Sequence, residues 1–285
     1  MVLGVESIGY LVPRTSFSGR IHSVFARACN IACGDTLLTL CASGGGDGPT
    51  TLRLARGAAH DLRDGFDVGE RIDCRQGQVR SSRVEFDLAR ASVWRPAELR
   101  HWLPRARIET HLRNAGLRLT QRRPMHESVI DREGAPVVAA LTEACAALDS
   151  ERAERQVDRL VGWGEGLTPA GDDVLIGLVA GLDALMRGDE RRRRFRDVMA
   201  VALSRRTHRT TAIAAHYLRL AAAGHFTEPV IRLRHALLCE EDREASDAAL
   251  RSALAVGATS GADTVTGLLA GLRAWLSTPS SAEAA

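Results

Sequence analysis

The spacing of apolar residues changes near residue 95, and this change limits the fold more than any other feature of the sequence. Before it, short apolar segments such as Thr36–Leu40 and Thr51–Leu54 alternate with a period near two, which is typical of strands. After it, apolar residues recur every three or four positions, as they do on helices. Strands followed by helices indicate an α+β protein rather than alternating βαβ units.

We therefore divide the chain into a β-rich N-terminal domain at residues 1–95, a helical domain at residues 96–277 that carries the functional site, and a flexible small-residue tail at residues 278–285. The glycine cluster Gly44–Pro49 is predicted to be a turn between two strands. The predicted helices are Ala97–Leu103, Ala135–Leu148, Ala153–Val161, Asp172–Met186, Phe195–Ser204, Thr211–Ala223, Pro229–Leu238, Ala245–Leu254 and Asp263–Leu276.

The composition excludes several kinds of chemistry, because all 38 positions counted as lysine or arginine are arginine. A lysine Schiff base, a P-loop lysine and a Ser-x-x-Lys pair are therefore ruled out. The net charge is only +3, and the basic run Arg191–Arg194 has no interleaved aromatic residue, so no nucleic-acid partner is expected. The longest apolar stretch, Val174–Met186, is too short to cross a membrane, and we expect a cytoplasmic protein.

The residues most often used for metal binding and proton transfer show no functional spacing. The six cysteines form no Cys-x-x-Cys pair and are interpreted as buried thiols rather than zinc ligands. His208, His216 and His225 have no acid at an orienting spacing, so we interpret them as structural rather than catalytic.

Two segments of the helical half resemble each other. Gly171–Leu182 (GDDVLIGLVAGL) and Gly261–Leu272 (GADTVTGLLAGL) lie 90 residues apart and agree at seven of twelve positions, including Asp173 and Asp263. We interpret them as two equivalent helices of an internal repeat. Each carries glycines four residues apart, which clears one helix face of side chains and permits a close crossing. If the two helices cross there, their N-terminal ends meet in one site.

Each repeated helix follows a glycine-bearing loop, and backbone N–H groups at such a helix start attract an anion. Asp172, Asp173 and Asp263 stand in the first turns, where capping alone would explain any one acid. Together the three carboxylates would repel one another unless a cation or a proton intervenes. Magnesium takes a few carboxylates plus water and substrate oxygens, so we expect these three acids to hold Mg²⁺ and to be the catalytic residues.

The loop and helix start Gly164–Asp173 (GEGLTPAGDD), with Gly177, resembles the signature of a family that includes the AllH-type subunit of oxamate carbamoyltransferase. The resemblance covers most of the chain and is weaker in residues 40–150. It implies carbamoyl transfer among oxamate, oxalurate and carbamoyl phosphate in allantoin and purine degradation, carried out with companion subunits. Supporting similarities lie at Ile21–Phe25, Asn30, Thr207–Ile213, Gly224–Glu228 and Val256–Thr264.

The predicted ligand is a small anion such as carbamoyl phosphate or oxamate. Thr207–Thr210 shares its arginine and final threonine with the Ser-Thr-Arg-Thr turn of familiar carbamoyltransferases, and Arg209 could pair with a phosphate or carboxylate through two hydrogen bonds. A plain polar helix cap is the alternative for this segment. The residues predicted to bind the substrate are Gly164, Gly166, Thr168, Gly171, Thr207, Arg209, Ser260, Gly261 and Asn30.

Two other functions stay open on the sequence. Asp263–Thr264 with Gly267 faintly resembles a helix of the ADP-ribosylglycohydrolases, which are all-α hydrolases with two magnesium ions. A strand-rich N-terminal half distinguishes this chain from them. The third hypothesis is a non-catalytic assembly subunit, in which the glycine stripes only pack helices and the loop docks a partner enzyme.

Overall fold

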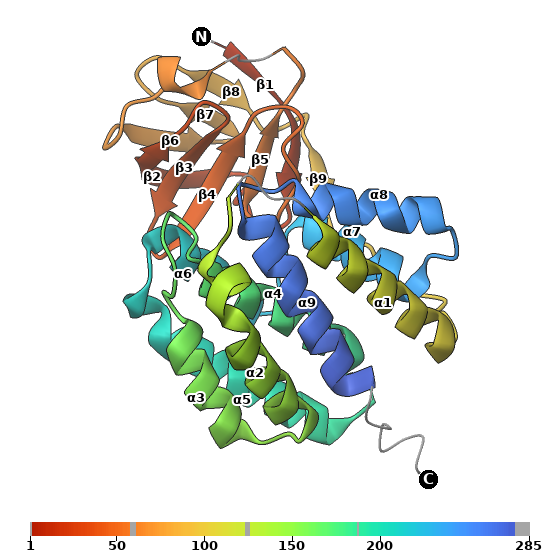
Figure 1. Cartoon of the computed structure of the whole chain (residues 1–285). Helices are drawn as coiled ribbons and strands as arrows, with labels where there is room; N and C mark the ends of the chain where they lie inside the picture. The colour runs from red at the N-terminus through yellow and green to blue at the C-terminus, as the bar shows by residue number, and fades with distance from the viewer. Residues whose placement is uncertain (1, 58–60, 123–125, 187, 277–285) are drawn as a thin grey trace. The chain divides into compact units, whose positions relative to one another are not determined.

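A computed structural model describes residues 2–57, 61–122, 126–186 and 188–276 of the chain (Figure 1). The chain divides into two compact units, Met1–Pro96 and Ala97–Ala285. The described strands all belong to the first unit and the α-helices to the second, which confirms the α+β class. The tail at 278–285, predicted to be flexible, lies outside the described residues.

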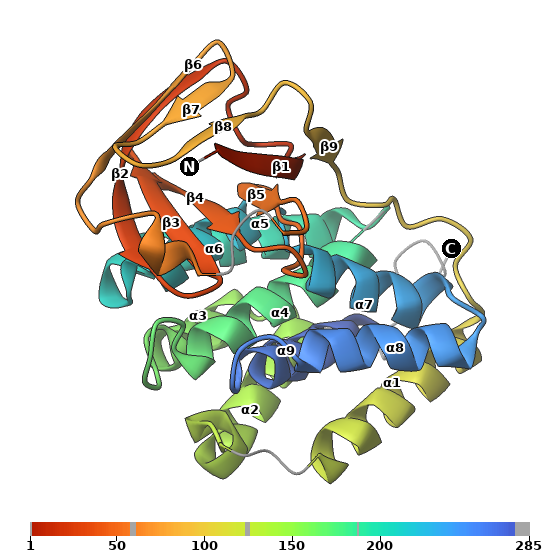
Figure 2. The same ribbon diagram turned by 90° about the horizontal axis from the view of Figure 1, so that it is seen from above.

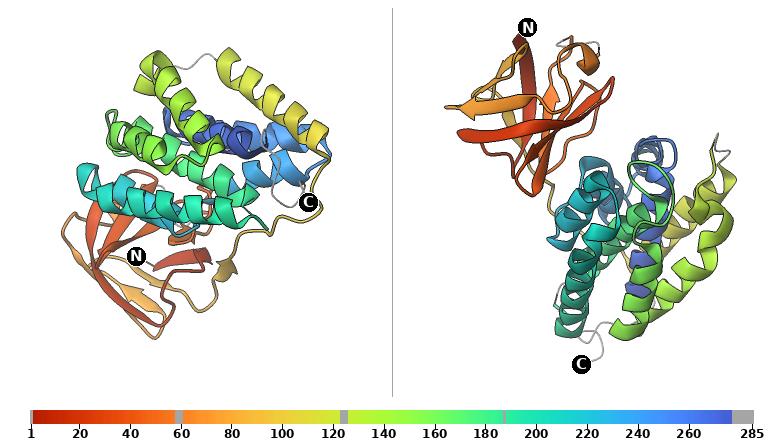
Figure 3. Two further views of the ribbon diagram at one scale, coloured as in Figure 1. Left: turned by 90° about the horizontal axis from the view of Figure 1, so that it is seen from below. Right: turned by 90° about the vertical axis from the view of Figure 1, so that its left-hand side faces the viewer.

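Eight strands of the first unit close into a barrel in the order β1-β5-β4-β3-β2-β6-β7-β8 (Figure 3). β1 closes it, because β1 pairs with β5 on one side and with β8 on the other, and β9 continues beside β1 where β8 ends. The strands are β1 Val2–Gly9, β2 Ser16–Val24, β3 Ala28–Cys33, β4 Thr36–Cys41, β5 Thr51–Leu54, β6 Arg71–Arg75, β7 Gln78–Arg80, β8 Glu85–Asp87 and β9 Ser92–Trp94.

The barrel interior is filled by alternate side chains of its strands. Ile8, Ile31, Leu40 and Leu52 are fully buried there, as the period-two pattern predicts. The glycine cluster connects β4 to its parallel neighbour β5. Asp47 of this connection is buried. Its carboxylate accepts the Ser7 hydroxyl at 2.5 Å and pairs with Arg53.

Within its described residues the second unit is helical, and every α-helix there except α1 corresponds to a predicted one. Short η segments join them: η2 Ile130–Gly134 is a π-helical turn that runs into α2, and η3 Thr207–Arg209 precedes α6. The α-helices are α1 Arg105–Gln121, α2 Ala135–Ala146, α3 Ser150–Leu160, α4 Ala170–Leu185, α5 Glu190–Arg206, α6 Ala212–Ala222, α7 Glu228–Cys239, α8 Arg243–Leu254 and α9 Ser260–Leu276.

The predicted helix Ala97–Leu103 is wrong, and α1 was not predicted. Pro104 disfavours helical backbone in the residue before it. The Leu103 N–H donates instead to the carbonyl of Leu238 in α7 at 2.9 Å. The helix begins directly afterwards at Arg105, with a sequence so polar that its apolar period is weak.

The internal repeat extends to four helices in each half. α1, α2, α3 and α4 correspond to α6, α7, α8 and α9, while α5 has no counterpart. The correspondence is reciprocal: α2 contacts α9 as α7 contacts α4, and α1 contacts α9 as α6 contacts α4. Local signals repeat as well, because α2 and α7 both carry proline in the first turn and α3 and α8 are capped by Asp149 and Asp242. The helical unit is thus a pseudo-two-fold duplication.

The repeated helices α4 and α9 cross closely at the centre of the unit (Figure 2). A Cβ on Gly177 would lie 2.7 Å from the Leu268 nitrogen, and a Cβ on Gly267 would lie 2.8 Å from the Leu178 nitrogen. Gly181, one turn after Gly177 on α4, faces Leu268 and Leu272, which lie one turn further along α9 than the residues that Gly177 faces. The two helices therefore run parallel. The predicted close packing of the glycine stripes is therefore confirmed.

Candidate functional site

The parallel crossing brings the N-terminal ends of α4 and α9 together. The Thr168 hydroxyl, just before α4, is hydrogen-bonded to the Ser260 hydroxyl, the first residue of α9, at 2.8 Å. These residues are 92 positions apart in sequence. The prediction that the two helix starts meet is confirmed, and the positive ends of two helix dipoles lie side by side there.

The loop before α4 depends on glycine for its shape. Gly162, Gly164 and Gly166 have φ of 74°, 118° and 91°, a backbone region that other residues rarely adopt. A Cβ on Gly164 would also lie 2.8 Å from the Ala170 nitrogen. Within the described residues, the backbone N–H groups from Gly164 to Thr168 have no protein acceptor, and the middle of the loop is exposed. The loop therefore offers consecutive free donors beside a helix start.

Asp172 ties this loop to the neighbouring one. One carboxylate oxygen accepts the Gly162 N–H at 3.0 Å, and the other accepts the Thr210 hydroxyl at 2.5 Å. Burial raises the pKa of Asp172, and the two hydrogen bonds oppose that rise. Both oxygens are engaged, so Asp172 ties the loop before α4 to the loop before α6.

Asp173 lies at the fourth position of α4 and is only 5% exposed. Burial raises the pKa of Asp173 to about 8. The Ser260 and Thr168 hydroxyls oppose the rise, whereas the negative charge of Asp263 adds to it. Its Oδ2 atom is buried and has no hydrogen-bond partner among the described residues.

Asp263 lies at the matching fourth position of α9 and is 1% exposed. Its Oδ1 atom accepts the Ser128 hydroxyl at 2.6 Å, and its Oδ2 atom is also buried without a partner in the described chain. Burial raises the pKa of Asp263 to about 6. Ser128 is held by Asp131, which in turn pairs with Arg122 at the end of α1.

The three predicted acids are therefore not equivalent. Two of them present a free buried oxygen, and the third does not. Among the residues that the structure describes, no group of three or more His, Cys, Asp or Glu side chains is placed to hold a metal ion. Magnesium at these acids remains a prediction.

Several of the other predicted residues support the site without facing it. Gly171 and Gly261 lie against the preceding helices: a Cβ on Gly171 would overlap the Leu160 carbonyl of α3, and one on Gly261 would overlap the Ala253 carbonyl of α8. Arg209 is paired with Asp158 at 2.9 Å. The Thr207 hydroxyl donates to the carbonyl of Ser204 in the last turn of α5.

Asn30 belongs to the barrel unit, on β3. Its amide nitrogen donates to the Ser23 hydroxyl at 3.0 Å, and its carbonyl oxygen accepts the Thr39 hydroxyl at 2.8 Å. The side chain is buried and joins three adjacent strands. Within the described contacts, Asn30 thus has a structural role in the barrel.

The histidines differ in their surroundings. His216 is buried on α6 against Tyr217, and burial lowers its pKa to about 4. Burial also lowers the pKa of His225. Neutral, packed imidazoles agree with the structural role expected for His216 and His225.

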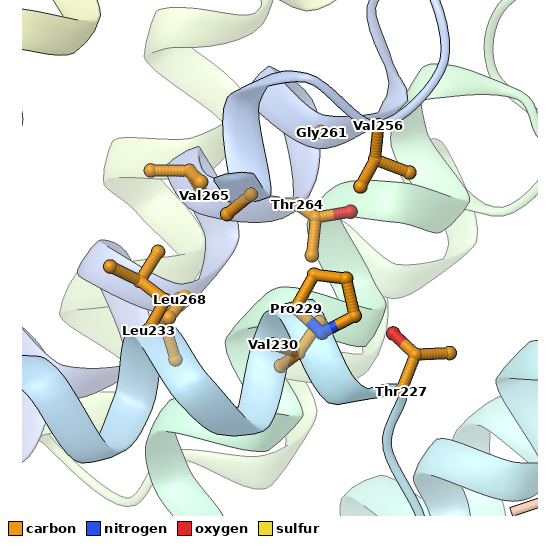
Figure 4. A pocket seen from close by; sticks show the side chains of 10 residues that line it. Thr227, Pro229, Val230, Leu233, Val256, Gly261, Thr264, Val265 and Leu268 are labelled. Carbon is orange, nitrogen blue, oxygen red and sulfur yellow. The ribbon is translucent and has the colours of Figure 1, made fainter. Parts of the chain in front are cut away.

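A small cavity of about 50 Å³ lies among α7, α8 and α9 (Figure 4). Its lining is mainly apolar and includes Val230, Leu233, Val265 and Leu268, with two threonines and no charged side chain. It has room for about one water molecule. It is a packing void beside α9, and it does not fit an anion.

Three residues near the acids were not predicted: Ser128, Asp131 and Arg122. Thr210 was noted only as part of the Thr207–Thr210 segment. The Thr210–Asp172 and Ser128–Asp263 contacts span 38 and 135 positions of sequence. Thr210 carried a signal, since it lies beside the predicted Arg209. The Ser128 link carried none, because a π-helical turn positions it and no apolar period marks that turn.

The fold and the site together define a class of protein: a closed barrel unit followed by a duplicated helical unit in which two Gly-rich helix starts surround buried acids. The chain belongs to the AllH family. Residues 6–93 match the AllH family N-terminal domain, and residues 160–272 match the family described as oxamate carbamoyltransferase subunit AllH. The second match contains both repeated helices and the loop before α4.

No solved structure matches the chain. Among the described residues, no helix is long and apolar enough to span a membrane.

Proposed function

We propose that this chain acts as the AllH subunit of a carbamoyltransferase for oxamate or oxalurate and carbamoyl phosphate, and that it binds one of these anions at the paired starts of α4 and α9. Family membership supports the reaction. The observation that carries the site is the contact between the two helix starts at Thr168 and Ser260.

The electrostatics of the helix starts support an anionic ligand. Each helix N-terminus carries roughly half a positive charge, and here two lie side by side in parallel helices. Asp173, with its pKa raised to about 8, is mostly protonated near neutral pH and neutralises little of this charge. The free N–H groups between Gly164 and Thr168 add donors of the kind that bind phosphate or carboxylate oxygens.

The ADP-ribosylglycohydrolase alternative loses its support, because those hydrolases are all-α and this chain has an eight-stranded barrel. The assembly-subunit alternative predicts a loop that binds a protein and no small anion. Companion subunits belong to either hypothesis, since the family is that of an enzyme subunit.

A glycine substitution in the loop tests the proposed site. Gly166→Ala places a side chain at a φ of 91° with no atom within 4 Å, so the substitution strains the loop without a clash. Gly188→Ala is the matched control, because Gly188 has a φ of 76° and equally open space between α4 and α5. Each substitution should cost about 1 to 2 kcal/mol of stability.

The measurement is calorimetric titration of oxamate, carbamoyl phosphate and inorganic phosphate into the whole chain, alone and with its companion subunits. Gly166→Ala should weaken binding at least tenfold, because displaced N–H groups no longer converge, while Gly188→Ala should bind as the wild type does. Absence of binding in the wild-type chain under both conditions would refute the anion site and favour the assembly role.

A further inference from the structure

Two buried oxygen atoms at the site lack a partner. Asp173 Oδ2 and Asp263 Oδ2 are enclosed by protein, and no described group donates a hydrogen bond to either. Buried carboxyl oxygens are rarely left without a donor, because burial removes the water that would otherwise pair with them. An unpaired oxygen on each of two equivalent acids points to a ligand that supplies the donors.

The two acids occupy equivalent positions beside the helix crossing. Asp173 and Asp263 each stand one turn before the glycine at which α4 and α9 meet, on the same helix stripe as that glycine. The helices are parallel and close at this crossing, which places the two acids at equivalent positions beside it. Their proximity agrees with the effect of the Asp263 charge on Asp173.

The chemistry of the missing group follows from what the acids repel. Asp263, with its pKa raised only to about 6, is mostly ionised near neutral pH, and its free oxygen would repel a phosphate or carboxylate oxygen. Asp173 is mostly protonated there, but once it gives up its proton its free oxygen also accepts hydrogen bonds. A ligand group with two hydrogen-bond donors therefore satisfies both free oxygens. A primary amide has two N–H donors on one nitrogen.

We propose that Asp173 and Asp263 together bind the –CO–NH₂ group of the ligand through their Oδ2 atoms, while its anionic end lies against the free N–H groups of the α4 loop. This inference rests on the proposed function. It assigns the amide end of the ligand to these two acids and the anionic end to the loop before α4. Oxamate and carbamoyl phosphate both have this pattern of donors and negative charge.

Oxamate and pyruvate provide the test, because they have the same shape and carboxylate but pyruvate has a methyl group in place of the NH₂ group. Wild-type chain, with companion subunits where they are needed for binding, should bind oxamate roughly 10 to 100 times more tightly than pyruvate, the range expected for hydrogen bonds to charged groups. Asp173→Asn and Asp263→Asn should each reduce this ratio at least fivefold.

Asp242→Asn is the matched control. Asp242 caps α8 through the Glu244 N–H, and asparagine caps helices about as well as aspartate. The control should keep the wild-type ratio of oxamate to pyruvate affinity. Circular dichroism of each variant verifies that the helical unit is folded.

Protonation gives a second readout. Burial, with the charges of Asp263 and Asp172, raises the pKa of Asp173 to about 8, so free Asp173 is mostly protonated near pH 7. Burial and Asp131 raise the pKa of Asp263 to about 6, and Arg122 opposes that rise. An amide donor favours the ionised form, so oxamate binding should release protons near pH 7, measured as a dependence of the binding enthalpy on the buffer. Pyruvate binding and the Asp173→Asn variant should show less release.

The outcomes separate this inference from the proposed function. Equal affinity for oxamate and pyruvate would leave the anion site intact and overturn the amide assignment. Magnesium that strengthens binding of both compounds in the wild type, and of neither in the Asn variants, would assign the two oxygens to a cation and also overturn it. Binding of neither compound, with or without companion subunits, would reject the proposed function itself.

Discussion

The crossing of α4 and α9 makes a quantitative prediction about stability. Replacing Gly177 with alanine places a Cβ 2.7 Å from the Leu268 nitrogen and closer still to the Thr264 carbonyl oxygen. Both are backbone atoms that no rotamer change can move, so the helices must separate. Overpacking of this kind costs about 1 to 3 kcal/mol or more.

Alanine also gains about 1 kcal/mol over glycine as a helix former. Because the clash involves backbone on two sides, we expect the upper end of the overpacking cost and a net loss of about 2 kcal/mol for Gly177→Ala. Gly267→Ala should lose the same amount, since its Cβ would meet α4 in the reciprocal geometry. The double variant should lose less than the sum, because helices already separated have room for the second methyl group.

The assay is urea denaturation followed by circular dichroism, whose helical signal comes from the second unit. Gly116→Ala on α1 is the control, because its Cβ would meet only the flexible end of the Arg273 side chain. That variant should stay within about 0.5 kcal/mol of the wild type or gain stability. If Gly177→Ala and Gly116→Ala unfold at the same urea concentration, the close crossing described above is wrong.

Two further predictions concern the acids. The pKa of Asp173 in the folded chain, about 8, exceeds its unfolded value of 3.8. The contribution of Asp173 to stability is therefore fully present below pH 3.8 and is lost as pH rises through 8. Between about pH 6 and 8 the free energy of unfolding should fall less steeply in Asp173→Asn than in the wild type. Asp172→Ala leaves the Gly162 N–H and the Thr210 hydroxyl without their acceptor and should cost about 1 to 3 kcal/mol of stability in thermal unfolding. Asp242→Ala, which removes a helix cap worth about 1 kcal/mol, is the comparison. An equal loss in both variants would contradict the proposal that Asp172 holds the two loops together.

The elements of the fold were largely predictable, because they depend on local spacing. The period of two identified strands such as β4 and β5, and the helical period identified most helices of the second unit. Closure of the barrel was not predictable, since β1 pairs with β5, β8 and β9 across 44 to 85 positions of sequence. Helix α1 was missed because only four of its residues are buried, and one of these is a histidine.

The site was predicted in part for the same reason. The repeat placed Asp173 and Asp263 at equivalent helix starts, and glycine spacing predicted that those helices pack together. Which carboxylate oxygens stay free depends on partners from other elements, such as Thr210 and Ser128. The sequence shows that these residues exist but not that they reach the acids.

The reciprocal contacts of the duplicated helices have a consequence for how the helical unit could arise. Each set of four helices presents a glycine stripe that its own three other helices do not cover, and the stripe is buried only by the stripe of the other set. A chain containing a single set would expose that stripe to water and would pair with a second copy of itself about the same axis. Its two acids would then be identical and its two loops equally long. The helical unit thus has the geometry of a symmetric homodimer joined in one chain, and its two halves differ at the site, where Asp172 of α4 matches Ala262 of α9.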